Sequence, residues 1–238
     1  MKSNRMQANV RYVTNFVDEV MSYVFFPIEG EPTQWMDIRP HLPNAKAVAV
    51  IQDIRSRRSA LSHGGDQALE LVERIKQARL QNTKLGIVGY QLMHELPYDI
   101  MEALKKGLPN ATFENLTEVY DEIQMYHSTE EVEFMKKAAK LTDIAAEGMV
   151  KATKPGATEA EIYGHTHAAS LIHGGEFDFS LIASTPMSDP SMPYPFPIPS
   201  HRRIRIGDIV STEISAGYWG YSGQLCRSIA VRKKPTKG

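Results

Sequence analysis

The segment of residues 209–227 limits the possible folds of this chain more than any other. It holds two runs that each suit an extended strand, separated by a glycine- and aromatic-rich connection at residues 217–220. Such a connection between two extended runs predicts an antiparallel hairpin. In a symmetric hairpin centred on this connection, Glu213 and Gln224 are opposite partners, with Cβ atoms roughly 4.5 to 5.5 Å apart.

One face of the predicted hairpin is polar. Because side chains alternate along a strand, that face carries Glu213, Ser215, Ser222 and Gln224. A polar set of this density favours the wall of a pocket over a core face. A solvated sheet face is the alternative, since antiparallel sheets often leave one face to water.

Composition and charge exclude several classes of protein. The chain has 238 residues, of which 42% are hydrophobic and 23% charged, as is typical of one large or two ordinary globular domains. Its 27 Lys and Arg nearly balance 28 Asp and Glu, so no nucleic-acid or anionic membrane partner is expected. No stretch is apolar over the length of a membrane span, and the first residues lack the apolar core of a signal peptide.

Cys226 is the only cysteine of the chain. An intrachain disulfide is therefore impossible, and a reducing, cytoplasmic location is the expectation. Its place in the hairpin favours a small buried thiol over a nucleophile.

Short apolar runs alternate with helical patterns in residues 1–126. Predicted strands are residues 9–16, 20–28, 45–51 and 84–89, and predicted helices are residues 66–80 and 97–106. Residues 52–62, which are basic, are expected to form a solvated loop, and an anion site at Arg55, Arg57 and Arg58 is the alternative. Strands that alternate with helices indicate an α/β domain over residues 1–126.

Two capping boxes open the second half of the chain. Ser128 with Glu131, and Thr158 with Glu161, have the spacing in which a side chain and a backbone N–H cap each other at a helix start. Each box predicts a helix, and the second helix is followed by a predicted strand at residues 177–184. The proline-rich loop at residues 189–199 is expected to be extended, and a docking peptide is one interpretation of it.

These motifs together resemble a known family. The run Gly207-Asp208-Ile209-Val210, the acidic position that follows, Gly220-Tyr221 and Arg227 are similar to the hairpin signature of the pita-bread family, which includes creatinase, prolidase and Xaa-Pro aminopeptidase (peptidase family M24). The K-P-G-A-T-E turn and the F-P-I-E-G-E-P segment resemble it too. The resemblance implies a creatinase-type N-terminal α/β domain over residues 1–126, incomplete at its start. It implies an α+β first half of a pita-bread domain, with an antiparallel hairpin, over residues 127–238.

The resemblance also implies the site. The two metal-binding aspartates of the family fall on Glu213 and Gln224, but an amide contributes no charge to a pair of divalent cations. No metal or other cofactor is therefore expected in this chain, whereas family relatives use Mn, Co or Zn. Glu213, Gln224 and Tyr221 are expected to bind substrate.

A histidine in the loop before the hairpin acts as acid or base in this family. Counting back from Gly207 places that position on Phe196, while His201 lies five residues nearer the hairpin. His201 is the candidate catalytic residue because histidine titrates near neutral pH. A surface residue of the loop is the alternative.

Two functions remain open from the sequence. The first is a divergent Xaa-Pro peptidase or creatinase-type C–N hydrolase with an impaired metal site, acting on a peptide or small-molecule substrate as a homodimer. The second is a non-catalytic pita-bread module for protein interaction. A plain metallopeptidase is disfavoured by Gln224. The family's further ligands, a histidine and two glutamates, come from a second half of the domain, so this chain alone is expected to be inactive.

Overall fold

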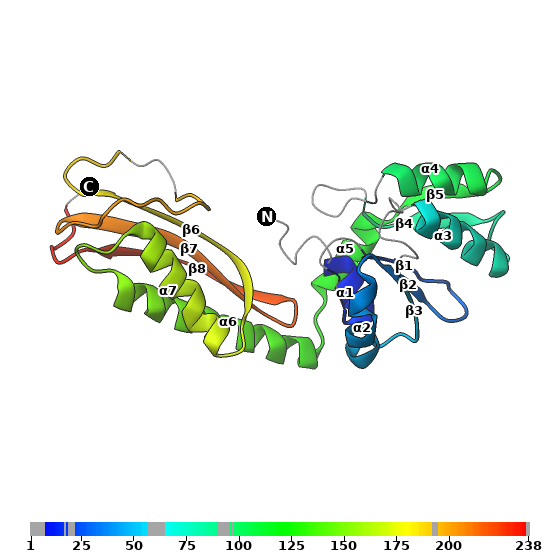
Figure 1. The fold of residues 1–238 in the computed structure, drawn as a ribbon, viewed down its shortest axis with the longest axis horizontal. Helices are drawn as coiled ribbons and strands as arrows, with labels where there is room; N and C mark the ends of the chain where they lie inside the picture. The colour runs from blue at the N-terminus through cyan, green and yellow to red at the C-terminus, as the bar shows by residue number, and fades with distance from the viewer. Residues whose placement is uncertain are drawn as a thin grey trace. The chain divides into compact units, whose positions relative to one another are not determined.

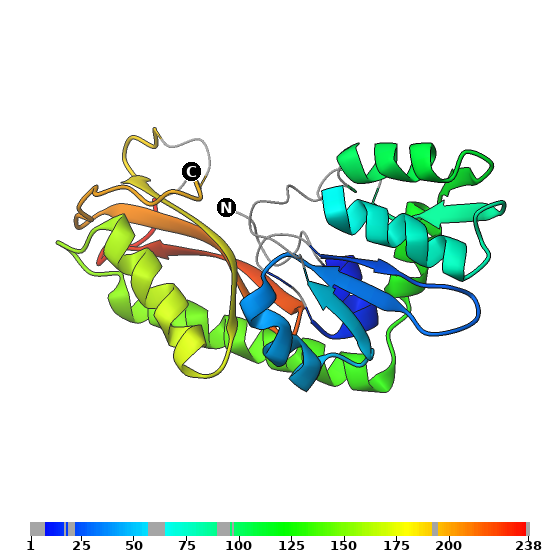
Figure 2. The ribbon, with the colours of Figure 1, turned by 45° about the vertical axis from the view of Figure 1, so that its right-hand side comes forward.

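The computed structural model describes residues 8–16, 18, 22–56, 65–89, 96, 98–191 and 195–236. The chain forms two compact units, Met1–Tyr126 and His127–Gly238, drawn in Figures 1 and 2. No helix in the described residues is both long and apolar enough to span a membrane.

The first unit is an α/β arrangement with two small sheets. Its elements in order are α1 (Ala8–Thr14), β1 (Ser22–Phe25), β2 (Thr33–Met36), the 3-10 turn η2 (Arg39–His41), α2 (Leu42–Val48), β3 (Asp53–Ser56), α3 (Gly65–Gln77), β4 (Lys84–Ile87), α4 (Tyr98–Gly107), β5 (Thr112–Asn115) and α5 (Thr117–Met125). Strand β2 pairs antiparallel with β1 and parallel with β3, and β4 pairs parallel with β5.

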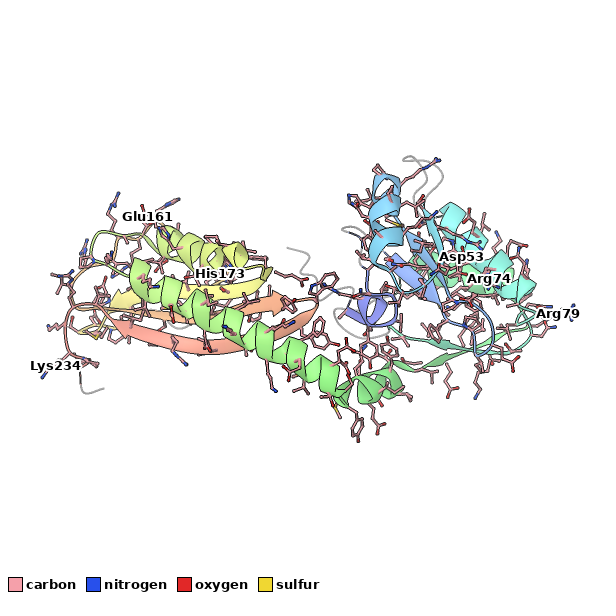
Figure 3. All side chains as sticks on the ribbon, turned by 90° about the horizontal axis from the view of Figure 1, so that it is seen from below. Asp53, Arg74, Arg79, Glu161, His173 and Lys234 are labelled. Atoms are coloured by element: carbon pink, nitrogen blue, oxygen red, sulfur yellow. The ribbon has the colours of Figure 1, made fainter. Side chains whose placement is uncertain are left out.

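The core of the first unit forms around Trp35. This side chain is fully buried and stacks on Tyr23, with ring centroids 5.5 Å apart. The apolar stripe of α3, including Val72 and Ile75, packs into the same cluster. Beside the sheet, Arg74 donates to Thr33 at 3.1 Å and Thr33 donates to Asp53 at 2.9 Å; Arg74 and Asp53 are labelled in Figure 3.

Two strands predicted in the first unit are wrong. Most of residues 9–16 lie in helix α1, which ends at Thr14, just before Asn15 adopts a left-handed φ of 61°. Residues 45–51 overlap helix α2, whose first turn contains a proline that presets helical φ. The basic segment expected to be a loop contains β3, and Arg55 there pairs with Asp53 at 2.7 Å. Arg57 and Arg58 lie outside the described residues.

The second unit has two helices and three strands: α6 (Thr129–Ala152), α7 (Glu159–Ile172), β6 (Glu176–Pro186), β7 (Asp208–Tyr218) and β8 (Tyr221–Ala230). Both predicted capping boxes are present, with Ser128 and Thr158 accepting from the backbone N–H of Glu131 and Glu161. A capping residue of this kind stabilises a helix by about 1 kcal/mol.

The three strands form one antiparallel sheet in the order β6-β7-β8. Helix α6 packs across β7 and β8 and α7 packs against β6, so both helices cover one face (Figure 1). Met149, Ile162, Val210 and Ile214 form the centre of the core between helices and sheet. The opposite face of the sheet carries the polar residues of the hairpin.

The register of the hairpin differs by two residues from the prediction. The turn consists of Trp219 and Gly220 alone, because Tyr218 pairs with Tyr221. Glu213 is therefore opposite Cys226, and Gln224 is opposite Ser215. A shift of two leaves each side chain on its predicted face, because the side-chain period of a strand is two.

His167 is buried between α7 and β6. Its ring lies 4.4 Å from that of Tyr163 and 4.6 Å from that of Phe177, measured between centroids. Its Nε2 has no hydrogen-bond partner among the described residues. Burial lowers the pKa of His167 to about 4, because a charged imidazole is disfavoured in apolar surroundings.

Candidate functional site

Glu213 and Gln224 meet on the polar face of the sheet, although they are not opposite partners. The amide Nε2 of Gln224 donates a hydrogen bond to Oε1 of Glu213 across the diagonal between β7 and β8. Residues on that diagonal remain within reach of long side chains. The pairing predicted from the sequence is thus present in a different register.

A second polar group lies nearer the hairpin turn. Asp178, which is 6% exposed, accepts a hydrogen bond from Ser222 at 2.5 Å. Asp178 reaches this position at the point where the pairing of β6 with β7 is irregular. The buried hydroxyl of Ser215, opposite Gln224, has no hydrogen-bond partner among the described residues. An unpaired buried hydroxyl costs free energy, and the Ser215 hydroxyl is closed to solvent.

Gly223 lies where strand β8 packs closely against helix α6. On the helix side, a Cβ at Gly223 would lie 2.7 Å from Cα of Ala139 and 2.9 Å from the carbonyl oxygen of Ala138. Only glycine lets β8 approach α6 this closely.

We expect Gly223→Ala to lower the free energy of unfolding of the second unit by about 2 kcal/mol, because the new methyl group meets backbone atoms that cannot yield. Gly164→Ala is the matched control: a Cβ there meets nothing within 4 Å, and alanine favours a helix. The measurement is denaturant unfolding followed by fluorescence of Trp219, in a Trp35→Phe background, since the chain has two tryptophans. Equal stability of the two variants would contradict the close approach.

A buried carboxylate anchors the loop before the hairpin. Glu159, 5% exposed, accepts from Ser184 Oγ at 2.6 Å and from both the backbone N–H and hydroxyl of Ser200, at 3.1 and 2.5 Å. The backbone N–H groups of Glu159 and Ala160 donate to carbonyls of the same loop, on Arg202 and Ser200. The first turn of α7 thus satisfies its free donors with this loop.

Arg202 connects this anchor to the start of β7. Its guanidinium donates to Ser184 at 2.7 Å and to Asp208 at 2.8 Å. Burial alone would raise the pKa of Asp208, but the hydrogen bonds from Arg202 and from the backbone of Arg205, with their positive charges, hold that pKa below its usual value. The carboxylate of Asp208 therefore stays ionised and fixes the chain at the hairpin entrance.

The residues of this anchor were not singled out as a site from the sequence. Glu159 was interpreted only as part of a capping box, and Asp208 only as part of the G-D motif. The sequence held no signal for this anchor, because Glu159, Ser200 and Arg202 come together only in the fold.

The structure places His201 and Phe196 at different points. His201 is exposed, between the anchored residues Ser200 and Arg202, beside the first turn of α7. Phe196 pairs with Ile182 of β6, and the neighbouring Leu181 is opposite Glu213. The position counted from the family pattern, Phe196, is thus separated from Glu213 by strand β6, and its partner Ile182 belongs to the core on the helix side of the sheet. His201 lies before the start of β7, and Glu213 is five residues beyond that start, roughly 17 Å along the strand. The catalytic role of His201 stays a prediction.

Tyr221 is not brought together with Glu213 and Gln224. Its hydroxyl donates to Glu131 in the first turn of α6 at 2.9 Å, and its ring packs 5.8 Å from that of Phe134. It therefore lies on the helix side of the sheet. Cys226 is exposed, so its expected burial is wrong. Cys226 is opposite Glu213 in the pairing of β7 with β8, so its side chain lies on the polar face of the sheet.

The donor set at this face does not fit a pair of divalent cations. Glu213 supplies a carboxylate, but Gln224 points an N–H donor at it, and the other carboxylate of this face, Asp178, is buried and accepts from Ser222. Two such cations need several negatively charged oxygens in common. In the part of the chain that the structure describes, no group of three or more His, Cys, Asp or Glu side chains gathers.

Two family models match the chain. Residues 5–126 match the creatinase/prolidase N-terminal domain, and residues 133–237 match metallopeptidase family M24. The first match lies within the first compact unit, and the second match lies within the second unit, which begins at residue 127.

Known proteins resemble both units. The Xaa-Pro dipeptidase of Pyrococcus horikoshii is 28% identical over 149 residues, covering 61% of this chain and 41% of the relative. An uncharacterized peptidase of Bacillus subtilis is 23% identical over 224 residues, covering 94% of this chain and 58% of the relative. The chain spans about two fifths to three fifths of the length of these relatives.

Solved structures show the same fold. The prolidase of Pyrococcus horikoshii superimposes with a TM-score of 0.74 at 22% identity, covering 97% of this chain and 60% of that one. The X-Pro aminopeptidase of Thermotoga maritima gives a TM-score of 0.75 at 17% identity, covering 98% of this chain and 61% of that one. The predicted α/β unit followed by an α+β partial pita-bread unit is confirmed.

Proposed function

This chain belongs to metallopeptidase family M24, with a creatinase/prolidase N-terminal domain, and from that membership we propose a divergent C–N hydrolase of the Xaa-Pro peptidase or creatinase type. Its metal site is impaired, and its substrate is a peptide or small molecule that binds the polar face of the β6-β7-β8 sheet. The observation that carries the proposal is the hydrogen bond from Gln224 to Glu213, at the positions where the family resemblance places two metal-binding aspartates.

The geometry supports binding through hydrogen bonds. Glu213 is a carboxylate acceptor, Gln224 offers its amide carbonyl, and the hydroxyl of Ser215 is buried beside them. A positively charged or N–H-rich group of a substrate matches this set. Hydrogen bonds to a charged group contribute about 1.5 to 3 kcal/mol each, enough to select such a substrate.

The binding test uses an Xaa-Pro dipeptide and isothermal titration calorimetry. We expect Glu213→Ala to weaken dipeptide binding about tenfold or more, because it removes a charged acceptor. Ser211→Ala is the matched control: Ser211 lies on the same face and bonds Ser228 at 2.9 Å, two residues before Glu213. Equal affinity for the dipeptide in both variants would remove Glu213 from the site.

The metal prediction has its own test. Because only one of the two positions that the family resemblance assigns to aspartates holds a carboxylate, Glu213, added Mn²⁺ should change neither dipeptide affinity nor thermal stability of the unaltered protein. Gln224→Asp, which restores a second carboxylate, is expected to create measurable Mn²⁺ binding by calorimetry. Tight Mn²⁺ binding by the unaltered protein would contradict the impaired site.

The second function, a non-catalytic interaction module, is favoured by one observation. Phe196, which carries no acid or base group, stands where the count from the family pattern places a histidine. Dipeptide binding without turnover would support this function. Turnover that His201→Ala abolishes would instead assign His201 as the acid or base. We further propose that the protein is a homodimer, which light scattering coupled to gel filtration would test. We also propose a cytoplasmic location, which fractionation of cells would test.

A further inference from the structure

Two basic segments far apart in the sequence meet at one end of the second unit. Residues 202–205 read Arg-Arg-Ile-Arg, and residues 232–234 read Arg-Lys-Lys. The N–H of Gly207 donates to the carbonyl of Val231 at 2.9 Å, and the N–H of Val231 donates to that of Asp208 at 2.8 Å. This pairing gathers positive charge locally in a chain whose formal net charge is −1.

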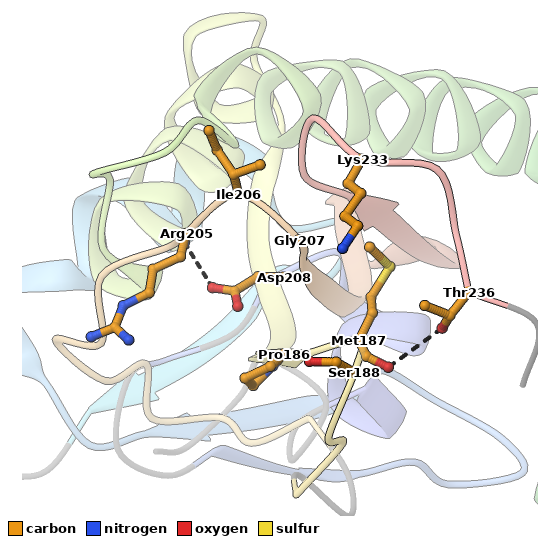
Figure 4. Close-up of a pocket in the computed structure, with 9 residues that line it drawn as sticks. All are labelled: Pro186, Met187, Ser188, Arg205, Ile206, Gly207, Asp208, Lys233 and Thr236. Carbon is orange, nitrogen blue, oxygen red and sulfur yellow. Dashed lines mark hydrogen bonds between the residues drawn. The ribbon is translucent and has the colours of Figure 1, made fainter.

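A pocket of about 210 Å³ lies where these segments meet (Figure 4). Its lining residues are Pro186, Met187, Ser188, Arg205, Ile206, Gly207, Asp208, Lys233 and Thr236. In Figure 4 the Lys233 side chain extends over the space between Gly207 and Met187, whereas the Arg205 guanidinium points away from that space.

The charge of the pocket is positive. Asp208 is the one carboxylate among its lining residues, and it is 2% exposed and already accepts hydrogen bonds from Arg202 and the N–H of Arg205. Arg205 and Lys233 are exposed and form no ion pair within the described residues. One cation, the Lys233 ammonium, thus faces the pocket, with the charge of Arg205 nearby and the Asp208 carboxylate paired with Arg202.

The backbone holds Lys233 in place. Arg232 has a left-handed φ of 49°, which is uncommon for a residue other than glycine. The turn there carries Lys233 back across Gly207, where a Cβ would lie 3.5 Å from Cδ of Lys233. The turn at Arg232 thus directs the chain so that the Lys233 side chain lies over the pocket.

We propose that this pocket binds a phosphate-type oxyanion. The ammonium of Lys233 and the hydroxyl of Ser188 are the direct donors, and Arg205 adds positive charge nearby. The volume accommodates one tetrahedral anion with a few waters. The anion is either inorganic phosphate or the phosphate group of a small metabolite, and the two present the same chemistry to the pocket.

The test measures binding of inorganic phosphate and of glycerol phosphate by calorimetry, against sodium chloride at equal ionic strength. Lys233→Gln is expected to weaken phosphate binding about tenfold, because it removes a charge-assisted contact. Lys234→Gln removes the same charge from the next residue, which is exposed, does not line the pocket and is labelled in Figure 3. It is expected to change affinity less than twofold.

The outcomes separate the alternatives. Loss confined to Lys233→Gln supports the pocket, and preference for glycerol phosphate over inorganic phosphate assigns the anion to a metabolite. Equal losses in both variants would mean diffuse attraction by surface charge and would overturn the proposal. So would phosphate binding no tighter than chloride.

Discussion

Arg202→Met is expected to lower the free energy of unfolding of the second unit by about 2 to 3 kcal/mol, since the pair is only partly shielded from water. The substitution removes the guanidinium that bonds Ser184 and Asp208 and leaves the Asp208 carboxylate, 3% exposed, without its ion-pair partner. Removing one member of a buried pair is costly because the other charge remains desolvated. Denaturant unfolding reported by Trp219 measures the loss.

Arg203→Met is the control for this prediction. Arg203 is the next residue and is exposed, and its guanidinium donates only to the carbonyl of Gly156 at 2.9 Å. We expect it to cost less than about 1 kcal/mol, as is usual for an exposed contact. If Arg203→Met destabilised the unit as much as Arg202→Met, the anchor would not depend on Asp208.

Acid should reveal the same anchor. Because the pKa of Asp208 is lowered in the folded state, its contribution is present above the unfolded value near 4 and is lost as the pH falls through the folded value. The Arg202→Met variant is expected to lack this part of the acid loss, because the carboxylate no longer gains from being ionised.

Between pH 6.5 and about 4, the second unit is expected to lose stability as the pH falls, and His167 is the cause. The pKa of His167 is about 4 in the folded state, against a usual value of 6.5. Between these two values the imidazole is protonated in the unfolded chain and neutral in the folded chain. Stability therefore rises with pH, by up to about 1.4 kcal/mol per unit and on the order of 3 kcal/mol across the window.

Two variants on one helix test this assignment. His167→Phe removes the titrating group and keeps an aromatic ring between Tyr163 and Phe177, so the pH dependence in this window should largely vanish. His165→Gln changes an exposed histidine two residues away and should leave it in place. Unfolding midpoints in urea at pH 4, 5, 6 and 7 measure both, and an unchanged slope in His167→Phe would exclude His167.

The second unit was more predictable from the sequence than the first. The starts of its helices can be predicted from residues close together in the sequence. Ser128 and Glu131, for example, cap the helix turn that their spacing predicts. In the first unit, apolar and polar residues alternate in residues 9–16, and this pattern predicts a strand where the structure has helix α1. There Tyr120 of α5 donates to the carbonyl of Asn9 at 2.9 Å, a contact between residues far apart that holds helix α1 and leaves no local signal.

The polar face was predicted correctly, although the register was not. The sequence locates the turn only to within residues 217–220. A two-residue turn at Trp219 and Gly220, as in the structure, is as compatible with this sequence as a four-residue turn. Since the error was even, Glu213 and Gln224 stayed on one face. The loop anchor at Glu159 could not be predicted, because its partners Ser184 and Ser200 are assigned by tertiary packing alone.

Strand β8 has one consequence for handling this polypeptide. In the described part of the chain it is the last strand of its sheet, with β7 on one side only. An unpaired strand edge is a template for another copy, and association by this route grows with protein concentration. Unfolding midpoints of this protein are therefore comparable only at matched concentration, and dilution series belong beside each of them.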